Sequence, residues 1–483
     1  MHKLIKAIFI VCLFSVATAN LTAQETPPAP GAPKSSKVPA VQEKKLANGL
    51  TVAVVEKNAV PLVTMNLLVR SGASTEPANK AGLADITASM LTKGTTSRSA
   101  SEIAEAVEFL GGSINSGAGW NSSFVSITVT SDKVDQAMAI LADVVLHPKF
   151  DQTELDLLKS QTLDGLTSGL KQPSTLANYV ASKYSFGEHP AGGTPASISS
   201  ITQADVQKFY TSGFLADASV LVFAGDISAA KANSLATSNL SSMKHLGGTG
   251  SGMGNGNGDR TRPKTVRRML VVDLPKSGQA AVGYFKPVWG LGRRSDRYFP
   301  AIVYNTVLGG GYSSRLNMEI RIKRGLSYGA GSSLGWRSGM ANFSTRAQTK
   351  NESAPQVAEL LIAEIDKMAD TEVAKDELVP RKSVLTGGFG RNLETTGGLA
   401  GALAELYSFH LPASDLNNYI TNVNAVTPTQ IKELGSYDTL GGDIIIVGDY
   451  SIFKDDLAKR FPGMKIDVIK ADELDLSKDN LRK

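Results

Sequence analysis

The sequence predicts an α+β protein made of two homologous halves, each an antiparallel sheet backed by helices. Three observations support this fold class. The chain has 483 residues, which is too many for a single hydrophobic core. Similar segments recur at an offset of roughly 220 residues, a period of domain size. In each half, runs that alternate between apolar and polar residues precede long amphipathic helices, an order typical of α+β domains.

The internal repeat sets the predicted domain boundaries. The paired segments are 155–160 with 378–383, 201–202 with 426–427, and 218–226 with 443–449. We therefore predict an N-terminal domain over 41–246 and a C-terminal domain over 263–475. Residues 247–262 lie between them and begin with the tract GGTGSGMGNGNG, whose composition predicts a flexible linker.

Hydrophobic periodicity places the main elements within each half. Alternation of apolar and polar residues predicts strands over 51–56, 63–70 and 124–130. Apolar residues at helical spacing predict a helix over 133–146 and a counterpart in the second half over 354–369. Because both helices have one apolar face, each can cover one face of a sheet.

The N-terminus has the features of an export signal. Over residues 1–23, Lys3 and Lys6 precede an apolar run at 7–16 that is too short to span a membrane, and small residues follow it. The alternative is a membrane anchor. Residues 24–40 are rich in proline, alanine and serine, a composition typical of an extended leader. We therefore expect a periplasmic or secreted protein whose mature chain has no stable membrane span.

Composition argues against several classes of function. The net charge of +5 is modest and forms no basic block, so nucleic-acid binding has little support. Cys12 is the only cysteine and lies in the signal peptide, so the mature chain would have neither disulfides nor thiolate metal ligands. His147, His189, His245 and His410 lack metal-ligand spacing, and we interpret them as structural.

The segment 308–328, with sequence LGGGYSSRLNMEIRIKRGLSY, has the pattern of a glycine turn followed by a short helix. The glycine triplet at 309–311 precedes two serines, which are natural N-cap residues. Leu316 and Ile320 would share one face of the helix. Gly325 would end it in the left-handed conformation that glycine adopts at little cost.

Arg324 and Tyr328 lie at the end of this predicted helix, with Arg324 on its last turn. From the residues alone, Arg324 would complement the helix dipole and Tyr328 would begin a strand. The segment nevertheless resembles the substrate-binding stretch in the C-terminal half of the pitrilysin/insulinase family of zinc peptidases. In that family an Arg and a Tyr four residues apart follow a GG…SSRL helix and reach the substrate beside the metal. The matching residues are Arg324 and Tyr328.

The resemblance extends over essentially the whole mature chain, including the sequence GEHP at 187–190. It implies paired homologous domains that form a clamshell around a peptide cavity. It also implies that Arg324 and Tyr328 act as catalytic contacts to the substrate. The glycine triplet would let the backbone approach the peptide closely. The implied substrate-binding residues are Gly309, Gly310, Gly311 and Ser313.

The metal site of that family has no counterpart in this sequence. The family carries H-x-x-E-H on a helix, with two His as ligands and the Glu as the base that activates water. Here Asp85, Ala88 and Ser89 stand at those three positions, and the further ligand falls at or near Gly165, beside Asp164. One carboxylate, a methyl group and a hydroxyl do not hold zinc, so we predict none on this chain. A hard cation on Asp85, Ser89 and Asp164 is a second possibility.

The resemblance therefore implies a non-zinc subunit of a heterodimeric zinc metallopeptidase, inactive alone. A homologous partner would hold the zinc, and this chain would bind the peptide substrate. Tyr328 would donate a hydrogen bond to the developing oxyanion, and Arg324 would supply positioning. Two alternatives stay open. The chain could be an inert structural or peptide-binding scaffold of a larger complex, or a lone peptidase with a divergent site.

Overall fold

The computed structural model describes residues 39–245 and 266–483. The predicted signal peptide over 1–23 with its Cys12, most of the leader over 24–40 and the linker over 247–262 lie outside the described residues. Within the described part, none of the helices combines the length and apolar character needed to cross a membrane. Both halves belong to one compact unit.

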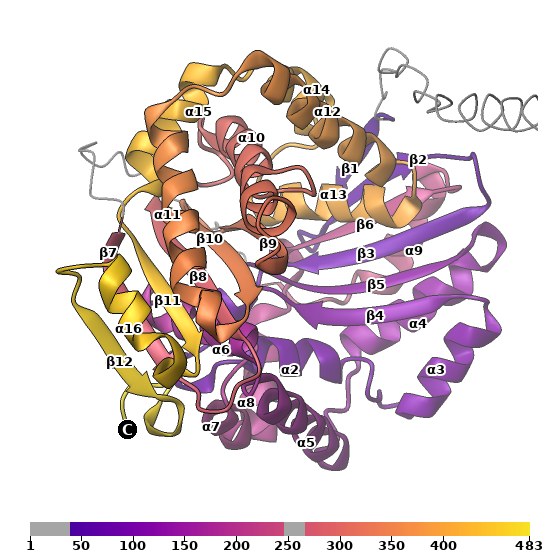
Figure 1. The fold of residues 1–483 in the computed structure, drawn as a ribbon. Helices are drawn as coiled ribbons and strands as arrows, with labels where there is room; N and C mark the ends of the chain where they lie inside the picture. The colour runs from indigo at the N-terminus through magenta and orange to yellow at the C-terminus, as the bar shows by residue number, and fades with distance from the viewer. Residues whose placement is uncertain (1–38, 246–265) are drawn as a thin grey trace, which may run out of the picture. The chain divides into compact units, whose positions relative to one another are not determined.

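The N-terminal half contains a six-stranded sheet in the order β1-β2-β6-β3-β5-β4 (Figure 1). Its strands are β1 (Val41–Lys45), β2 (Thr51–Glu56), β3 (Leu62–Val69), β4 (Ser113–Ala118), β5 (Ser123–Thr130) and β6 (Ser219–Gly225). Its helices are α2 (Leu83–Met90), α3 (Ala100–Phe109), α4 (Val134–Leu146), α5 (Gln152–Gly169), α6 (Pro173–Tyr184), α7 (Pro195–Ser200), α8 (Gln203–Gly213) and α9 (Ala229–Leu240).

The C-terminal half repeats this arrangement, with a six-stranded sheet in the order β12-β7-β11-β8-β10-β9. Its strands are β7 (Val266–Asp273), β8 (Ala280–Trp289), β9 (Ser327–Trp336), β10 (Met340–Thr349), β11 (Gly442–Gly448) and β12 (Ile466–Lys470). Its helices are α10 (Tyr298–Leu308), α11 (Ala354–Asp370), α12 (Lys375–Asn392), α13 (Thr396–Ser408), α14 (Asp415–Ala425), α15 (Pro428–Leu434) and α16 (Tyr450–Arg460).

The duplication predicted from the sequence is confirmed by the matching order of five strands, β2-β6-β3-β5-β4 and β7-β11-β8-β10-β9, while the sixth strands differ, since β1 begins its half and β12 ends its half. It extends to local detail at the helix starts. Thr202 begins α8 and Thr427 begins α15, and each forms a reciprocal capping box with the residue three positions later. The two threonines therefore satisfy the same unpaired backbone donors at equivalent points of the two halves.

The sheets are mixed, whereas the sequence analysis expected antiparallel ones. β2 pairs with β6 in parallel, and β7 pairs in parallel with both β11 and β12. The reason is topological, because β6 and β11 each return to the sheet after a long helical connection, which allows a parallel neighbour. Apolar alternation shows that a segment is a strand but carries no information on the direction of its partners.

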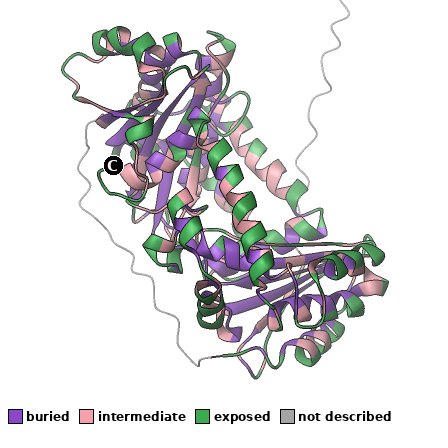
Figure 2. Cartoon of the chain, turned by 90° about the horizontal axis from the view of Figure 1, so that it is seen from below, coloured by how far each residue is buried: buried purple, intermediate pink, exposed green. Residues whose placement is uncertain are grey.

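One helix of each half packs against the sheet of the other half. The apolar face of α13 packs against β3 and β6, and that of α6 packs against β8 and β11 (Figure 1). The central strands β6 and β11 are consequently buried along their whole length, as Figure 2 shows for the sheet interiors. This exchange explains why two halves with separate sheets form one compact unit.

Removing a buried side chain of α13 should therefore destabilise the whole fold. Leu403 of α13 is fully buried against the N-terminal sheet. We expect Leu403→Ala to lower the free energy of unfolding by about 2–5 kcal/mol, because it removes buried apolar surface and leaves a cavity. Urea denaturation measures the change. Leu157→Ala is the matched control, since that side chain is 53% exposed and should change stability by less than about 0.5 kcal/mol.

Candidate functional site

Helix α2 holds the positions at which the resemblance places metal ligands. Asp85 is exposed, Ser89 is half-buried and Ala88 is fully buried. The carboxylate of Asp85 already accepts a hydrogen bond from the backbone N–H of Ala118 on β4, at 3.1 Å. Helical spacing alone would place these three residues on a face opposite Leu83, Ile86 and Met90. Instead, Ala88 is as deeply buried as the apolar residues, because the helix packs on more than one side.

These residues do not fit a zinc ion. In residues 39–245 and 266–483, no group of three or more His, Cys, Asp or Glu side chains is placed to hold a metal. Gly165 and Asp164, at the position of the further ligand, are exposed on α5. A hard cation would need several more oxygen ligands than Asp85 and Ser89 provide. The geometry therefore gives neither metal a complete set of ligands at these positions.

The N-terminus of α2 is fixed by a carboxylate that the sequence analysis missed. The buried side chain of Glu76 accepts hydrogen bonds from the backbone N–H groups of Gly82, at 2.8 Å, and Ala84, at 2.7 Å. Nε2 of His189 lies 3.0 Å from the same carboxylate and 3.1 Å from the carbonyl oxygen of Ala73. An acidic side chain at a helix N-terminus is stabilising, so Glu76 keeps α2 in place although its metal ligands are absent.

We expect Glu76→Ala to lower the free energy of unfolding by about 3 kcal/mol, because two buried N–H groups and the imidazole of His189 lose a charged partner. Chemical denaturation of the two proteins measures the difference. Glu105→Ala on the exposed face of α3 serves as the matched control. Equal stability of the Glu76→Ala protein and the wild type would contradict this role.

The segment 308–328 forms a turn and a short, wide helix. α10 ends at Leu308, a π-helical segment η5 (Asn317–Ile322) follows, and β9 begins at Ser327. Leu316 and Ile320 are buried and Gly325 has φ of 63°, so these three expectations are confirmed. The helix itself is π-helical in its main part, which residue spacing does not reveal. Arg324 consequently lies in the turn after the helix rather than on its last turn.

Arg324 is directed back onto its own helix. Its guanidinium forms an ion pair with Glu319 and donates a hydrogen bond to the carbonyl oxygen of that residue, at 3.0 Å. Lys323 pairs with the same carboxylate. The hydrogen bond from Lys323, together with that from Arg324, lowers the pKa of Glu319 below its ordinary value. In this arrangement Arg324 acts as the helix-end cation that the residues alone suggested.

Tyr328 and Ser313 lie on the surface of the same region. Tyr328 is 88% exposed, near the start of β9, which is the edge strand of its sheet. Within the described residues, no hydrogen bond engages its hydroxyl. Ser313 is exposed as well, and both its hydroxyl and its carbonyl oxygen accept hydrogen bonds from Arg381 on α12.

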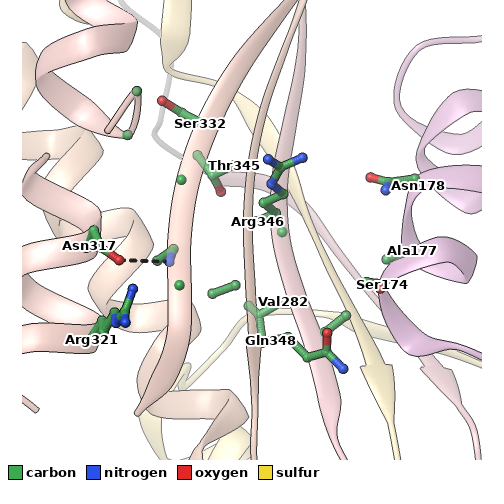
Figure 3. Close-up of a pocket in the computed structure, with 18 of the residues that line it drawn as sticks. Ser174, Ala177, Asn178, Val282, Asn317, Arg321, Ser332, Thr345, Arg346 and Gln348 are labelled. Atoms are coloured by element: carbon green, nitrogen blue, oxygen red, sulfur yellow. Dashed lines mark hydrogen bonds between the residues drawn. The ribbon is translucent and has the colours of Figure 1, made fainter. Parts of the chain in front are cut away.

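A cavity of about 950 Å³ lies beside the glycine triplet (Figure 3). Its wall includes Gly309, Gly310 and Gly311, parts of β8, β9 and β10, and α6 from the other half. Arg321 of η5 lies on this wall, with its guanidinium 5.3 Å from the ring centre of Tyr312. Arg324, Tyr328 and Ser313 do not line it, although Gly329, next to Tyr328, does. The structure thus brings the glycine triplet to the cavity together with a different arginine.

Asn317 connects the glycine turn to the cavity strand. Its side-chain oxygen accepts a hydrogen bond from the backbone N–H of Ala330, at 3.4 Å (Figure 3). Its side-chain nitrogen donates to the carbonyl oxygen of Tyr312. The same buried amide therefore fixes both the turn and β9. Asn317 and Arg321 could not be identified from residue spacing, and the only available signal was their position inside the segment that resembles the family.

The segment at 187–190 joins the two halves near this region. Glu188 accepts two hydrogen bonds from the guanidinium of Arg337, at 2.9 and 2.8 Å, and one from the amide of Asn342, at 2.9 Å. The Arg337 guanidinium lies 4.5 Å from the ring centre of Trp120. Bidentate pairing of this kind fixes orientation as well as distance, so Glu188 holds the edge of the C-terminal sheet against the N-terminal half.

Comparison with known proteins gives matches to one family in both halves of the chain. The family model described as "Insulinase (Peptidase family M16)" matches residues 51–177, and the one described as "Peptidase M16 inactive domain" matches residues 200–385. Two sequence relatives are named uncharacterized zinc proteases. The one from Streptomyces coelicolor is 24% identical over 410 residues, covering 83% of this chain and 87% of the relative. The one from Rickettsia felis is 26% identical over 388 residues, covering 79% and 91%.

Solved structures share the fold over nearly all of the described chain. A peptidase M16 inactive domain from Pseudomonas fluorescens has a TM-score of 0.76 and 25% identity, and covers 84% of this chain and 98% of that one. A protease from Helicobacter pylori has a TM-score of 0.71 and 18% identity, with coverage of 85% and 100%. The two family models together span more than half of the sequence. The chain belongs to peptidase family M16, the pitrilysin/insulinase family.

Proposed function

We propose that this protein is the non-zinc subunit of a two-chain M16 metallopeptidase and that it holds the peptide substrate for a homologous partner. Membership of the family and relatives named zinc proteases support a role in peptide hydrolysis. The single observation that carries the proposal is a contrast. Helix α2 presents Asp85, Ala88 and Ser89 where ligands would be needed, while Tyr328 is 88% exposed beside a peptide-sized cavity.

The proposed chemistry of this chain is positioning and hydrogen bonding. The partner would supply the metal and its activated water. Tyr328 would donate a hydrogen bond from its hydroxyl to the oxyanion that forms on the scissile carbonyl, for which an exposed phenol is suited. Arg321 is better placed than Arg324 to hold the peptide, since it lies on the cavity wall while Arg324 is paired with Glu319.

The glycine-rich surface next to Tyr328 suits an extended peptide. β9 is an edge strand, but the N–H groups of Ala330 and Ser332 on its outer side already bind Asn317 and Gly309, so a bound segment would pair with backbone groups of β9 outside these two positions. Added Cβ atoms at Gly311 and Gly329 would meet no other atom within 4 Å, so open space adjoins both residues. We also propose export to the periplasm or the cell exterior, on the basis of the signal-like residues 1–23.

An inert scaffold is the alternative function. It is favoured by the pairing of Arg324 with Glu319, which is what a purely structural arginine would do. In that case the cavity would take no part in peptide hydrolysis, and replacement of the exposed Tyr328 would not change the rate of peptide cleavage.

Co-expression tests the proposal. This chain is produced alone and together with an M16 chain that carries an intact H-x-x-E-H motif, such as one encoded in an adjacent reading frame. We expect stoichiometric zinc in the second chain only, and cleavage of a quenched fluorescent peptide pool only when both chains are present. Stoichiometric zinc in this chain, with peptide hydrolysis by it alone, would overturn the proposal.

A further inference from the structure

The cavity beside the glycine triplet carries positive charge that no described residue of its wall neutralises. Among the described residues that line it, Arg321 and Arg346 are the only charged ones. Neither forms an ion pair within the described residues. Other arginines of the same half do form such pairs, as Arg315 does with Glu377 and Arg337 with Glu188. An uncompensated guanidinium in a concave site is a good partner for an anion from outside.

Strand alternation places Arg346 on the open face of the sheet. Its neighbours Thr345 and Ala347 are buried, whereas Arg346 is exposed, as the two-residue period of β10 requires. The residue opposite it on β9 is Gly331, which has no side chain to cover the guanidinium. Figure 3 shows Arg346 on the side of the sheet that faces α6, with Asn178 of that helix across the cavity.

The chemistry of the wall favours a carboxylate. A guanidinium presents several N–H donors in a planar fork that matches the two oxygens of a carboxylate. Asn178 adds a side-chain amide donor from the opposite wall. The cavity volume of about 950 Å³ accommodates several residues of a peptide, so one acidic group in such a segment can reach Arg346.

We propose that Arg346 forms a carboxylate subsite in this cavity, so that the peptides held by the protein carry a carboxylate at that point. This inference rests on the proposed function and adds the class of substrate that it selects. The carboxylate comes either from a Glu or Asp side chain or from the free C-terminus of the peptide. Arg346 is the principal cation because it is exposed to the cavity, whereas Arg321 is half-buried beside Tyr312.

Three matched probes distinguish the sources of the carboxylate. All are decapeptides of alanine, serine and leucine that carry an uncharged fluorophore on a blocked N-terminus and one variable central residue. The first has a central Glu and an amidated C-terminus, the second a central Gln and an amidated C-terminus, and the third a central Gln and a free C-terminus. Fluorescence anisotropy measures the Kd of each for the purified full chain. We expect one of the two carboxylate peptides, or both, to bind about 10-fold or more tightly than the neutral one.

Variants assign this preference to Arg346. Arg346→Gln should abolish it and leave the Kd of the neutral peptide unchanged, with an unchanged melting temperature as the check on folding. Arg391→Gln, the same change at an exposed arginine of α12 outside the cavity, should keep the preference. Equal binding of all three peptides, or a preference that survives Arg346→Gln, would overturn the subsite and leave the two-chain function standing. If no peptide binds at concentrations up to about 1 mM, the result contradicts both the carboxylate subsite and the proposed role in holding peptides. The two-chain cleavage assay tests that role separately.

Discussion

Tyr328→Phe is expected to lower the kcat of the assembled two-chain peptidase by about 100- to 1,000-fold, the usual loss when one oxyanion donor is removed. The substitution deletes only the hydroxyl of a side chain that is 88% exposed. No group in the described residues forms a hydrogen bond with that hydroxyl. The melting temperature of this chain and its affinity for the partner should therefore stay unchanged. Steady-state hydrolysis of one quenched fluorescent peptide, with both chains at fixed concentration, gives kcat and KM separately.

The controls separate a catalytic loss from a general one. Tyr437→Phe makes the same change at another partly exposed tyrosine and should leave the rate intact. Arg321→Gln should raise KM because it changes the cavity wall, whereas Arg324→Gln should mainly release Glu319 and lower stability slightly. An unchanged kcat for Tyr328→Phe would favour the inert scaffold over the proposed subunit.

The sequence was most informative where one local interaction decides the structure. The repeated segments that contain Thr202 and Thr427, the buried pair Leu316 and Ile320, and the left-handed Gly325 were all identifiable, because each depends on residues within one or two turns. The duplicated fold class followed from the same local patterns repeated at a domain-sized offset.

Such local patterns could not predict the contacts between segments that are distant in the sequence. The exchange of α6 and α13 between the two sheets depends on apolar helix faces that fit either half equally well. The direction of Arg324 depends on Glu319, and a π-helical segment changes which side chains reach the cavity. For that reason the sequence pointed to Arg324, while the geometry places Arg321 on the cavity wall. The family resemblance identified the segment but did not fix the orientation of its side chains.

A buried carboxylate in the C-terminal sheet is expected to have a large effect on stability. Asp443 of β11 accepts hydrogen bonds from Arg268, at 3.0 and 2.7 Å, and from Arg267, at 3.2 and 3.2 Å. Arg268 also donates to the carbonyl oxygen of Tyr184 at the end of α6 and lies 4.0 Å from its ring centre. The carboxylate therefore orients the arginine that ties the exchanged helix α6 to the sheet beneath it.

We expect Asp443→Ala to lower the free energy of unfolding by about 3–5 kcal/mol at pH 7, because it leaves two guanidinium groups without their shared buried partner. Urea denaturation measures this loss. Asp455→Ala, the same change at an exposed position of α16, should have little effect. Since both arginines are partly exposed and can regain water, the loss should fall toward the lower end of the range.

The pH dependence gives a second, independent test of Asp443. Burial raises the pKa of its carboxyl, but the hydrogen bonds from Arg268 and Arg267 outweigh burial and leave the pKa below its ordinary value. A carboxyl with a lowered pKa stabilises the fold fully above its unfolded-state pKa of about 4, and this stabilisation is lost as the pH falls through the folded-state pKa. The stability difference between the wild type and Asp443→Ala should therefore be constant from neutral pH to about pH 5 and shrink below about pH 4. A difference that grows on acidification would show that Asp443 is held as the neutral acid, and that the arginines do not act as its partners.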